Sequence, residues 1–362
     1  VDQGTTNTKA LLIDANGSIL AIAKTRLKRI HPNPGWVEQD PLEIWNSVIT
    51  SVKEVLTKFK DKAQLVKGVG IADQGETIIL WDKQTGTPVY NAIVWQDRRT
   101  AGMLSKLLSQ YPDLEKEIRQ RTGLMLDPYF SASKISWILQ NVEKAREKIK
   151  QGRLLIGTTD TWIVWMLTRG KLFVTDYTTA SRTMLLNIHT LRWDEVLLDT
   201  FGVPADALPE IIQNAQPICC IDDKLFGFNS PISNIMVDQQ AALFGHMCFV
   251  KGDVKATYGT GAFVLMNIGS SPIISSSGFL TTIAWVLNNT PTYALDGGVY
   301  HAGALIDYLI ENLKIIKDPD EADRIASETM SNEGVYFVPA LAGLSAPYWD
   351  TCLLYTSPSP RD

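Results

Sequence analysis

Alternating apolar and polar positions near the start of the chain predict a hairpin of two strands, followed by a helix. Residues 9–14 and 18–27 have strand-like patterns, and the Ala-Asn-Gly between them is a good tight turn. Asp40 is then placed to cap a helix, with Pro41 at its first position and Glu43 three residues on. Apolar residues recur at helical spacing along one side of that helix, and they are Leu42, Trp45, Val48, Ile49, Val52, Val55, Leu56 and Phe59.

Strand-like and helix-like patterns alternate further along the chain. Residues 66–82 are typical of a strand, a polar turn and a second strand, and residues 203–224 are irregular and rich in turn formers. Helical periodicity is found in four stretches, which are residues 100–110, 114–122, 131–149 and 160–167. A chain of 362 residues is long for one compact domain and fits two.

A short turn of Gly and Thr residues occurs twice. Gln3-Gly4-Thr5-Thr6 leads into the first predicted strand, and Tyr258-Gly259-Thr260-Gly261 leads into another apolar strand. Such repetition indicates one turn in each of two similar domains. Each turn offers backbone N–H groups and hydroxyls to an anion, and Gly lets the backbone approach a ligand closely.

The two turns match no common phosphate-binding motif. Neither belongs to a GxxxxGK[ST] loop or to a GxGxxG dinucleotide fingerprint. Either turn alone also fits an ordinary hairpin. As a matched pair, each beside a carboxylate, they favour a phosphate clamp between two lobes.

Composition narrows the class of protein. The content of 45% apolar and 20% charged residues is typical of a globular protein with a core, and a net charge of −5 argues against nucleic acid as the main partner. No apolar run is long enough to span a membrane, and no signal peptide is visible. The four Cys and four His show neither disulfide nor metal-ligand spacing. We therefore expect a cytoplasmic enzyme.

Both ends of the chain are unusual. The first residue is Val1, inside what reads as the start of a strand, so we expect a fragment without its own start, and a signal peptide could have been lost with that start. Residues 352–362, CLLYTSPSPRD, have no periodicity and resemble the translation of a sequencing-library adapter. We therefore treat them as a non-native tail, and we expect the natural protein to continue past Thr351.

Several long segments, in the right order, resemble one protein family. They are DQGTTNTKA, PNPGWVEQDPLEIW, YNAIVWQDRRT, GLMLDPYFSASKISWIL, GTTDTWIVWMLT, TDYTTASRTMLLNIHTLRWD, DQQAALFGH, TYGTGAFVLMN and GLSAPYWD. On these segments the chain is similar, over residues 1–351, to the FGGY family of carbohydrate kinases, and within it to the branch that phosphorylates glycerol. Residues 129–141 also fit the first signature pattern of that family.

The resemblance implies an α/β fold of the actin-like ATPase type, with two ribonuclease-H-like lobes around a deep cleft. We expect an N-terminal lobe over residues 1–243, a partial C-terminal lobe over residues 244–351 and the non-native tail over residues 352–362. The paired Gly/Thr turns are what such a fold leads one to expect. The adenosine-binding segment of the family is expected beyond the end of this chain.

The resemblance also implies a catalytic carboxylate. Asp238 matches the general base of the family, which accepts the proton of the attacking hydroxyl. Asp2 matches a carboxylate close to Mg²⁺ and its water shell, and Asp238 is expected to face the same metal. From the residues alone, Asp238 equally fits a structural Asp at a helix N-terminus, and Asp2 a turn residue at the end of a strand.

Phosphate-binding residues follow from the same matches. They are Thr5, Thr6, Asn7, Lys9, Gly259, Thr260, Gly261 and Gly303. Lys9 stands where the branch usually has Arg, so the charge is kept but the two-pronged geometry is lost. Asp307 stands where Gln is usual. It would repel a phosphate or bind ribose, and its role stays open.

The acceptor pocket is the most informative part of the resemblance. The matched residues are the aromatic walls Trp95 and Phe263 and the hydroxyl-binding Glu76, Tyr129, Asp238 and Gln239. Such a pocket suits a small polyol, although Trp95 and Phe263 alone also fit core packing. Gly75 replaces an Arg that would donate to two hydroxyls, at roughly 1.5–3 kcal/mol for each charged hydrogen bond. Its loss weakens glycerol binding, opens room for a longer polyol, or is compensated by water or another side chain.

Together these matches imply phosphorylation of glycerol to sn-glycerol 3-phosphate, by in-line transfer from Mg·ATP. Two alternatives stay open: a kinase for another small polyol or ketose, favoured by Gly75 and Lys9, and a non-catalytic actin-like protein that binds nucleotide. The expected ligands are ATP, Mg²⁺ and a small polyol, without nucleic acid or membrane. The resemblance also implies a homo-oligomer.

Overall fold

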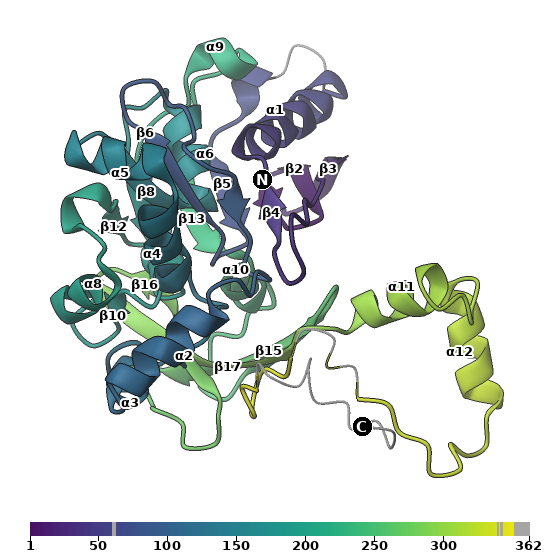
Figure 1. The fold of residues 1–362 in the computed structure, drawn as a ribbon. Coiled ribbons are helices and arrows are strands. Elements are labelled where there is room, and N and C mark those ends of the chain that lie inside the picture. Colours follow the sequence, from purple (N-terminus) through teal and green to yellow (C-terminus); the bar gives the residue numbers. More distant parts are fainter. Residues whose placement is uncertain (60–62, 339, 341–342, 351–362) are drawn as a thin grey trace.

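A mixed five-stranded sheet is built around the start of the chain (Figure 1). In this computed structural model, which describes residues 1–59, 63–338, 340 and 343–350, its strands run in the order β13-β5-β1-β2-β3. They are β13 (Ile232–Val237), β5 (Val69–Asp73), β1 (Asp2–Gln3), β2 (Asn7–Ile13) and β3 (Ile19–Arg26). The strands β1, β2 and β3 are antiparallel, and β5 and β13 continue the sheet in parallel. The predicted hairpin is therefore confirmed.

Helix α1 (Pro41–Thr57) packs on β2 and β3 and begins where the sequence predicts. Asp40 Oδ1 accepts a hydrogen bond from the backbone N–H of Leu42, while Glu43 accepts from the N–H of Lys28 instead of closing a capping box. The predicted stripe is wrong at Leu42, which is 46% exposed. The buried face is turned by one position because serines on α1 bond to threonines on the sheet, in the pairs Ser47–Thr8 and Ser51–Thr25.

A second sheet, antiparallel and four-stranded, lies beside the first. It consists of β4 (Glu38–Gln39), β7 (Ala92–Ile93), β6 (Ile78–Asp82) and β8 (Leu154–Thr158). Because β5 and β6 belong to different sheets, the polar turn between them crosses from one sheet to the other. The helices that follow are α2 (Ala101–Gln110), α3 (Leu114–Thr122), α4 (Ser131–Asn141), α5 (Glu143–Lys150) and α6 (Thr159–Leu167). The helix predicted over residues 131–149 is broken at Val142, whose backbone is extended.

Shorter elements connect these layers. The strand pairs are β9 (Val174–Asp176) with β12 (Glu210–Ile212), and β10 (Leu186–Asn187) with β11 (Arg192–Trp193). The helices are α7 (Tyr177–Ala180), α8 (Glu195–Phe201), α9 (Asp223–Phe226) and α10 (Asp238–Gly245), with 3₁₀ turns at η1 (Ala63–Leu65) and η2 (Ala205–Ala207). Helix α10 starts directly where β13 ends, so Asp238 stands at the edge of the first sheet.

The last sheet is antiparallel and carries the second Gly/Thr turn. Its strands, in order, are β14 (Val254–Tyr258), β15 (Ala262–Gly269), β17 (Thr290–Val299) and β16 (Leu280–Leu287). Helices α11 (Gly303–Glu311) and α12 (Pro319–Glu328) follow, and Figure 1 shows them standing apart from the body of the chain. No residue of either helix is buried. Among the described residues, no helix has both the length and the apolar character needed to cross a bilayer.

Candidate active site

A cavity of about 510 Å³ lies between the two Gly/Thr turns. Its lining includes most of the residues that the sequence singles out, namely Asp2, Thr5, Thr6, Asn7, Lys9, Glu76, Trp95, Tyr129, Asp238, Gln239, Gly259, Thr260, Gly261 and Phe263. Residues from the first sheet, from α10 and from the last sheet therefore meet at one place. Gly75, Gly303 and Asp307 do not line this cavity, and Asp307 is exposed on α11.

The first turn joins β1 to β2 and has its carbonyl oxygens engaged by protein donors. The carbonyl of Gly4 accepts from Gln3 Nε2 at 2.9 Å, and that of Thr5 accepts from Gln39 Nε2 at 2.7 Å. The carbonyl of Thr6 accepts from the N–H of Leu27 at 2.9 Å. Carbonyl oxygens would repel a phosphate, and their engagement by protein donors weakens that repulsion at the turn.

The second turn joins β14 to β15 and repeats this arrangement. The carbonyl of Gly261 accepts from the N–H of Gly259 at 2.8 Å. The carbonyls of Gly259 and Thr260 accept from the N–H groups of Gly303 and Ala302, at 2.8 and 2.9 Å. A Cβ atom on Gly303 would lie only 2.6 Å from the carbonyl oxygen of Gly259. Gly303 thus supports the second turn from behind rather than facing the cavity.

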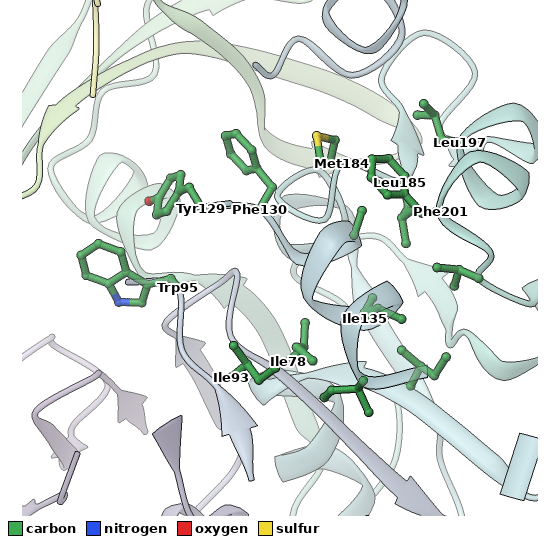
Figure 2. Close-up of a cluster of buried hydrophobic side chains, with 14 of the residues drawn as sticks. Ile78, Ile93, Trp95, Tyr129, Phe130, Ile135, Met184, Leu185, Leu197 and Phe201 are labelled. Atoms are coloured by element: carbon green, nitrogen blue, oxygen red, sulfur yellow. The ribbon is translucent and has the colours of Figure 1, made fainter. Parts of the chain in front are cut away.

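Aromatic rings close one end of the cavity. The ring centroids of Trp95 and Tyr129 are 5.6 Å apart, and those of Trp95 and Phe263 are 6.1 Å apart. Figure 2 shows Trp95 and Tyr129 next to each other at the edge of the buried apolar cluster. Edge-to-face packing of this kind gives flat apolar walls with polar atoms only at their rims.

Glu76 is the buried carboxylate of this aromatic end, with 5% exposure. Burial raises its pKa, and the guanidinium of Arg182 opposes that rise. Arg182 Nε donates to Glu76 Oε1 at 2.7 Å. The nearby Lys134 is fully buried and donates to the carbonyl oxygens of Tyr129 and Phe130, and burial lowers the pKa of its ammonium to about 7. Arg182 and Lys134, which the sequence did not indicate, therefore fix the Glu76 carboxylate and the backbone of the aromatic end.

Asp238 occupies the first position of α10 and faces the cavity. Burial, together with the negative charges of Glu76 and Asp2, raises the pKa of its carboxyl to about 7. A carboxyl group with such a pKa is poised to take up a proton near neutral pH. The peptide before it is fixed, because the N–H of Val237 donates to Thr178 Oγ1 at 2.9 Å.

A divalent cation fits the oxygen groups at this place. Asp2 and Asp238 both line the cavity, and Asp2 Oδ2 lies 3.3 Å from Lys9 Nζ. Mg²⁺ is commonly held by one or two carboxylates together with substrate phosphates and waters. In the part of the chain that the structure describes, no three His, Cys, Asp or Glu side chains form a group that could hold a metal by themselves. The donor set fits a metal that is shared with phosphate.

Gly75 turns out to be a constrained backbone position. Its φ of +65° lies in the left-handed region, and a Cβ atom there would be 2.6 Å from Val237 Cγ2. Arg182 Cγ would lie 3.9 Å from the same Cβ. The space beside Gly75 is thus filled by Val237 and Arg182, and its missing side chain leaves no opening for a longer ligand.

Lys255 is a further residue that sequence reasoning missed. It lies on β14 with 3% exposure, and its ammonium donates to Gln239 Oε1 and to Thr257 Oγ1. Its charge also lowers the pKa of Asp238 against the effect of burial. Strand alternation was the available signal, because Lys255 shares a face of β14 with the cavity-lining Thr257.

Two family models match consecutive parts of the chain. The N-terminal domain of the FGGY family of carbohydrate kinases matches residues 1–245, and its C-terminal domain matches residues 254–354. The chain belongs to the FGGY family of carbohydrate kinases. Its two-domain fold is the actin-like ATPase fold of that family.

Relatives of this FGGY kinase include glycerol kinases. The chain is 48% identical over 352 residues to the glycerol kinase of Francisella tularensis subsp. mediasiatica, covering 97% of this chain and 70% of that protein. Identity to the glycerol kinase of Parabacteroides distasonis is 48% over 350 residues, with the same coverage. The crystal structure of Plasmodium falciparum glycerol kinase with ADP superposes with a TM-score of 0.87 at 38% identity, covering 97% of this chain and 70% of that one.

Another solved structure shares the fold at lower identity. Gluconate kinase from Lactobacillus acidophilus superposes with a TM-score of 0.81 at 24% identity, covering 97% of this chain and 69% of that one. At that identity the likeness concerns the fold alone.

Proposed function

We propose that this FGGY kinase transfers the γ-phosphoryl group of ATP to glycerol and forms sn-glycerol 3-phosphate. The observation that carries the proposal is the cavity itself, in which Asp238 stands between two anion-binding turns and an aromatic end with a buried carboxylate. The 48% identity to curated glycerol kinases supports glycerol as the acceptor.

Asp238 acts as the general base in this proposal. As the acceptor oxygen forms its bond to the γ-phosphorus, the bond from that phosphorus to the bridging oxygen of ADP breaks, and the hydroxyl proton passes to the Asp238 carboxylate. The N–H groups and hydroxyls of the two turns hold the phosphates on either side. Mg²⁺, held by Asp2 and Asp238 with the phosphates, supplies charge neutralisation when it is bound.

The aromatic end binds the acceptor. Trp95 and Phe263 pack against its C–H groups, and Glu76 and Gln239 accept or donate hydrogen bonds at its hydroxyls. Gly75 does not widen this end, because Val237 and Arg182 fill the space beside it. A three-carbon polyol therefore suits the pocket better than a longer one.

The proposal is tested by measuring ATP-dependent phosphorylation of glycerol, beside a panel of small polyols and ketoses. Because the chain covers 70% of the Francisella relative, the assay uses the chain alone and the chain extended by the part of that relative that it does not cover. Glycerol should be the best acceptor in whichever form is active, and Asp238→Asn should remove the activity. A higher kcat/KM for another polyol or for a ketose would show that this compound, and not glycerol, is the acceptor. Nucleotide binding without transfer to any acceptor would contradict a kinase.

A further inference from the structure

Arg182 joins two buried carboxylates, one from the turn between β5 and β6 and one from the last sheet. Its Nε donates to Glu76 Oε1 at 2.7 Å, and its Nη1 lies 2.9 Å from Asp296 Oδ2. The three side chains are 4%, 6% and 8% exposed. Glu76 lies in the segment that crosses between the first two sheets, and Asp296 lies on β17 of the last sheet.

The guanidinium has little freedom to leave this position. Its carbon lies 5.5 Å from the ring centroids of both Tyr129 and Phe130. The segment that carries it is anchored on two sides, because the Thr183 carbonyl accepts from the N–H of Ala132 at 2.8 Å and Ser181 Oγ lies 2.9 Å from Thr282 Oγ1 on β16. Arg182 is thus held between the acceptor end of the cavity and the last sheet.

A carboxylate buried like Glu76 needs such a partner to keep its charge. Burial alone favours the protonated form, and a cation at hydrogen-bond distance opposes that preference. The other titratable groups that act on Glu76, or on Asp238 and Tyr129 beside it, are Lys134 on α4, Asp238 on α10, Asp2 on β1, Lys255 on β14, Asp296 on β17, and the tyrosines Tyr129 and Tyr300. Three cations, Arg182, Lys134 and Lys255, surround this end, and Arg182 is the one that donates a hydrogen bond to the Glu76 carboxylate.

We propose that Arg182 is a positioning residue for acceptor binding, which holds the Glu76 carboxylate toward the acceptor hydroxyls by bridging it to Asp296. The inference rests on the proposed function, because it assigns Glu76 to the acceptor. It follows that the acceptor pocket is complete only when the sheet bearing the second phosphate turn is docked against Arg182. The nucleotide side and the acceptor side of the cavity thereby share one ionic link.

The test measures the KM for glycerol, the KM for ATP and kcat at several pH values. Arg182→Met should raise the glycerol KM about ten- to hundredfold, which is the loss of one charge-assisted hydrogen bond, with the ATP KM nearly unchanged. The ratio of variant to wild-type glycerol KM should fall as the pH rises, because the unpaired Glu76 then ionises only at higher pH. Arg182→Lys should recover part of the loss, and Asp296→Asn should raise the glycerol KM by a smaller factor.

Arg121→Met is the matched control, because Arg121 forms an ion pair with Asp194 away from the cavity. It should leave the glycerol KM unchanged at every pH. An unchanged glycerol KM in Arg182→Met, or equal changes in the KM values for glycerol and ATP, would overturn the role of Arg182. If Arg182→Met does not fold, the same comparison of glycerol KM with ATP KM is made in Arg182→Lys and Asp296→Asn. Absence of acceptor turnover in the wild type would instead overturn the proposed function and this inference with it.

Discussion

The indole nitrogen of Trp95 donates to the hydroxyl oxygen of Thr5 at a distance of 2.7 Å. One residue forms the wall of the acceptor end, and the other belongs to the first phosphate turn. The hydrogen bond also joins segments far apart in the sequence, and it fixes the wall relative to the turn. The two halves of the cavity are therefore held at a set separation, which in-line transfer requires.

Removing this hydrogen bond should slow transfer more than it weakens acceptor binding. Trp95→Phe keeps an aromatic wall, and we expect kcat to fall about fivefold, the equivalent of about 1 kcal/mol, with a small change in the glycerol KM. Thr5→Val should lower kcat further, because it also removes a hydroxyl from the phosphate turn. The double variant should lose no more than Thr5→Val alone, which a double-mutant cycle measures. Additive losses would show that the two side chains act independently.

Asp238→Asn should abolish the proposed chemistry while binding persists. General bases contribute about 10²- to 10⁴-fold, so kcat should fall by at least about a hundredfold. Because the pKa of Asp238 is raised to about 7, the wild-type rate should increase with pH through about 7 and then level off. Glycerol should still raise the melting temperature of the variant. The exposed Asp199 supplies the control, since Asp199→Asn should retain the wild-type rate and pH profile.

The same substitution should stabilise the fold at neutral and higher pH. The pKa of Asp238 rises from its ordinary 3.8 to about 7 in the folded protein, so the unfolded chain loses this proton first. Stability from the protonated carboxyl is complete below the unfolded pKa and is lost as the pH rises through the folded pKa. Asp238→Asn should therefore melt a few degrees above the wild type at pH 8, with a smaller difference at pH 5. Thermal unfolding checks this, and a lower melting temperature at pH 8 would contradict it.

Gly75→Ala should destabilise the protein more than Gly152→Ala does. Both glycines have left-handed φ values, +65° and +60°, but an added Cβ meets Val237 at 2.6 Å at position 75 and nothing within 4 Å at position 152. We expect the overpacked variant to lose about 1–3 kcal/mol more of its unfolding free energy. Urea titration measures the difference, and adding Val237→Ala to Gly75→Ala should reduce it. Equal losses for the two glycines would rule out overpacking.

Gly303→Ala should impair the nucleotide side alone. The new Cβ would lie 2.6 Å from the carbonyl oxygen of Gly259, so the start of α11 must move away from the second turn. We expect the ATP KM to rise several-fold and the glycerol KM to stay constant. Gly102→Ala is the control, because its Cβ would meet nothing within 4 Å on α2 and should slightly stabilise that helix. An effect on the glycerol KM alone would show that Gly303 acts on the acceptor side of the cavity and would contradict this prediction.

Local patterns predicted the elements that depend on local chemistry. The hairpin at Asn16-Gly17, the cap at Asp40 and the paired turns all follow from residues close together in the sequence. The break at Val142 escaped prediction because apolar residues keep helical spacing on both sides of it. Leu42 was misplaced because hydroxyl pairs with the sheet, which no periodicity records, set the rotation of α1.

Family resemblance predicted the cavity lining well, and contacts between distant segments could not be predicted. Fourteen of the seventeen residues in the predicted site line one cavity. Arg182 and Asp296 are far apart in the sequence, and each alone is a single charge with no pattern that points to a partner. Only the docking of β17 against the turn after α7 makes them partners. The roles of the lining residues stay predictions until the variants above are measured.

The engaged carbonyls of the two Gly/Thr turns have a consequence for the order in which ligands arrive. Oxygen atoms of the backbone could have coordinated a bare cation, but those of all six turn residues already accept hydrogen bonds from the protein. Of the three carboxylates that line the cavity, that of Asp2 is 3.3 Å from the ammonium of Lys9 and that of Glu76 accepts from Arg182. A free divalent ion thus finds few ligands here, whereas a polyphosphate brings its own. We therefore expect the metal to bind as a complex with the nucleotide, and not before the nucleotide.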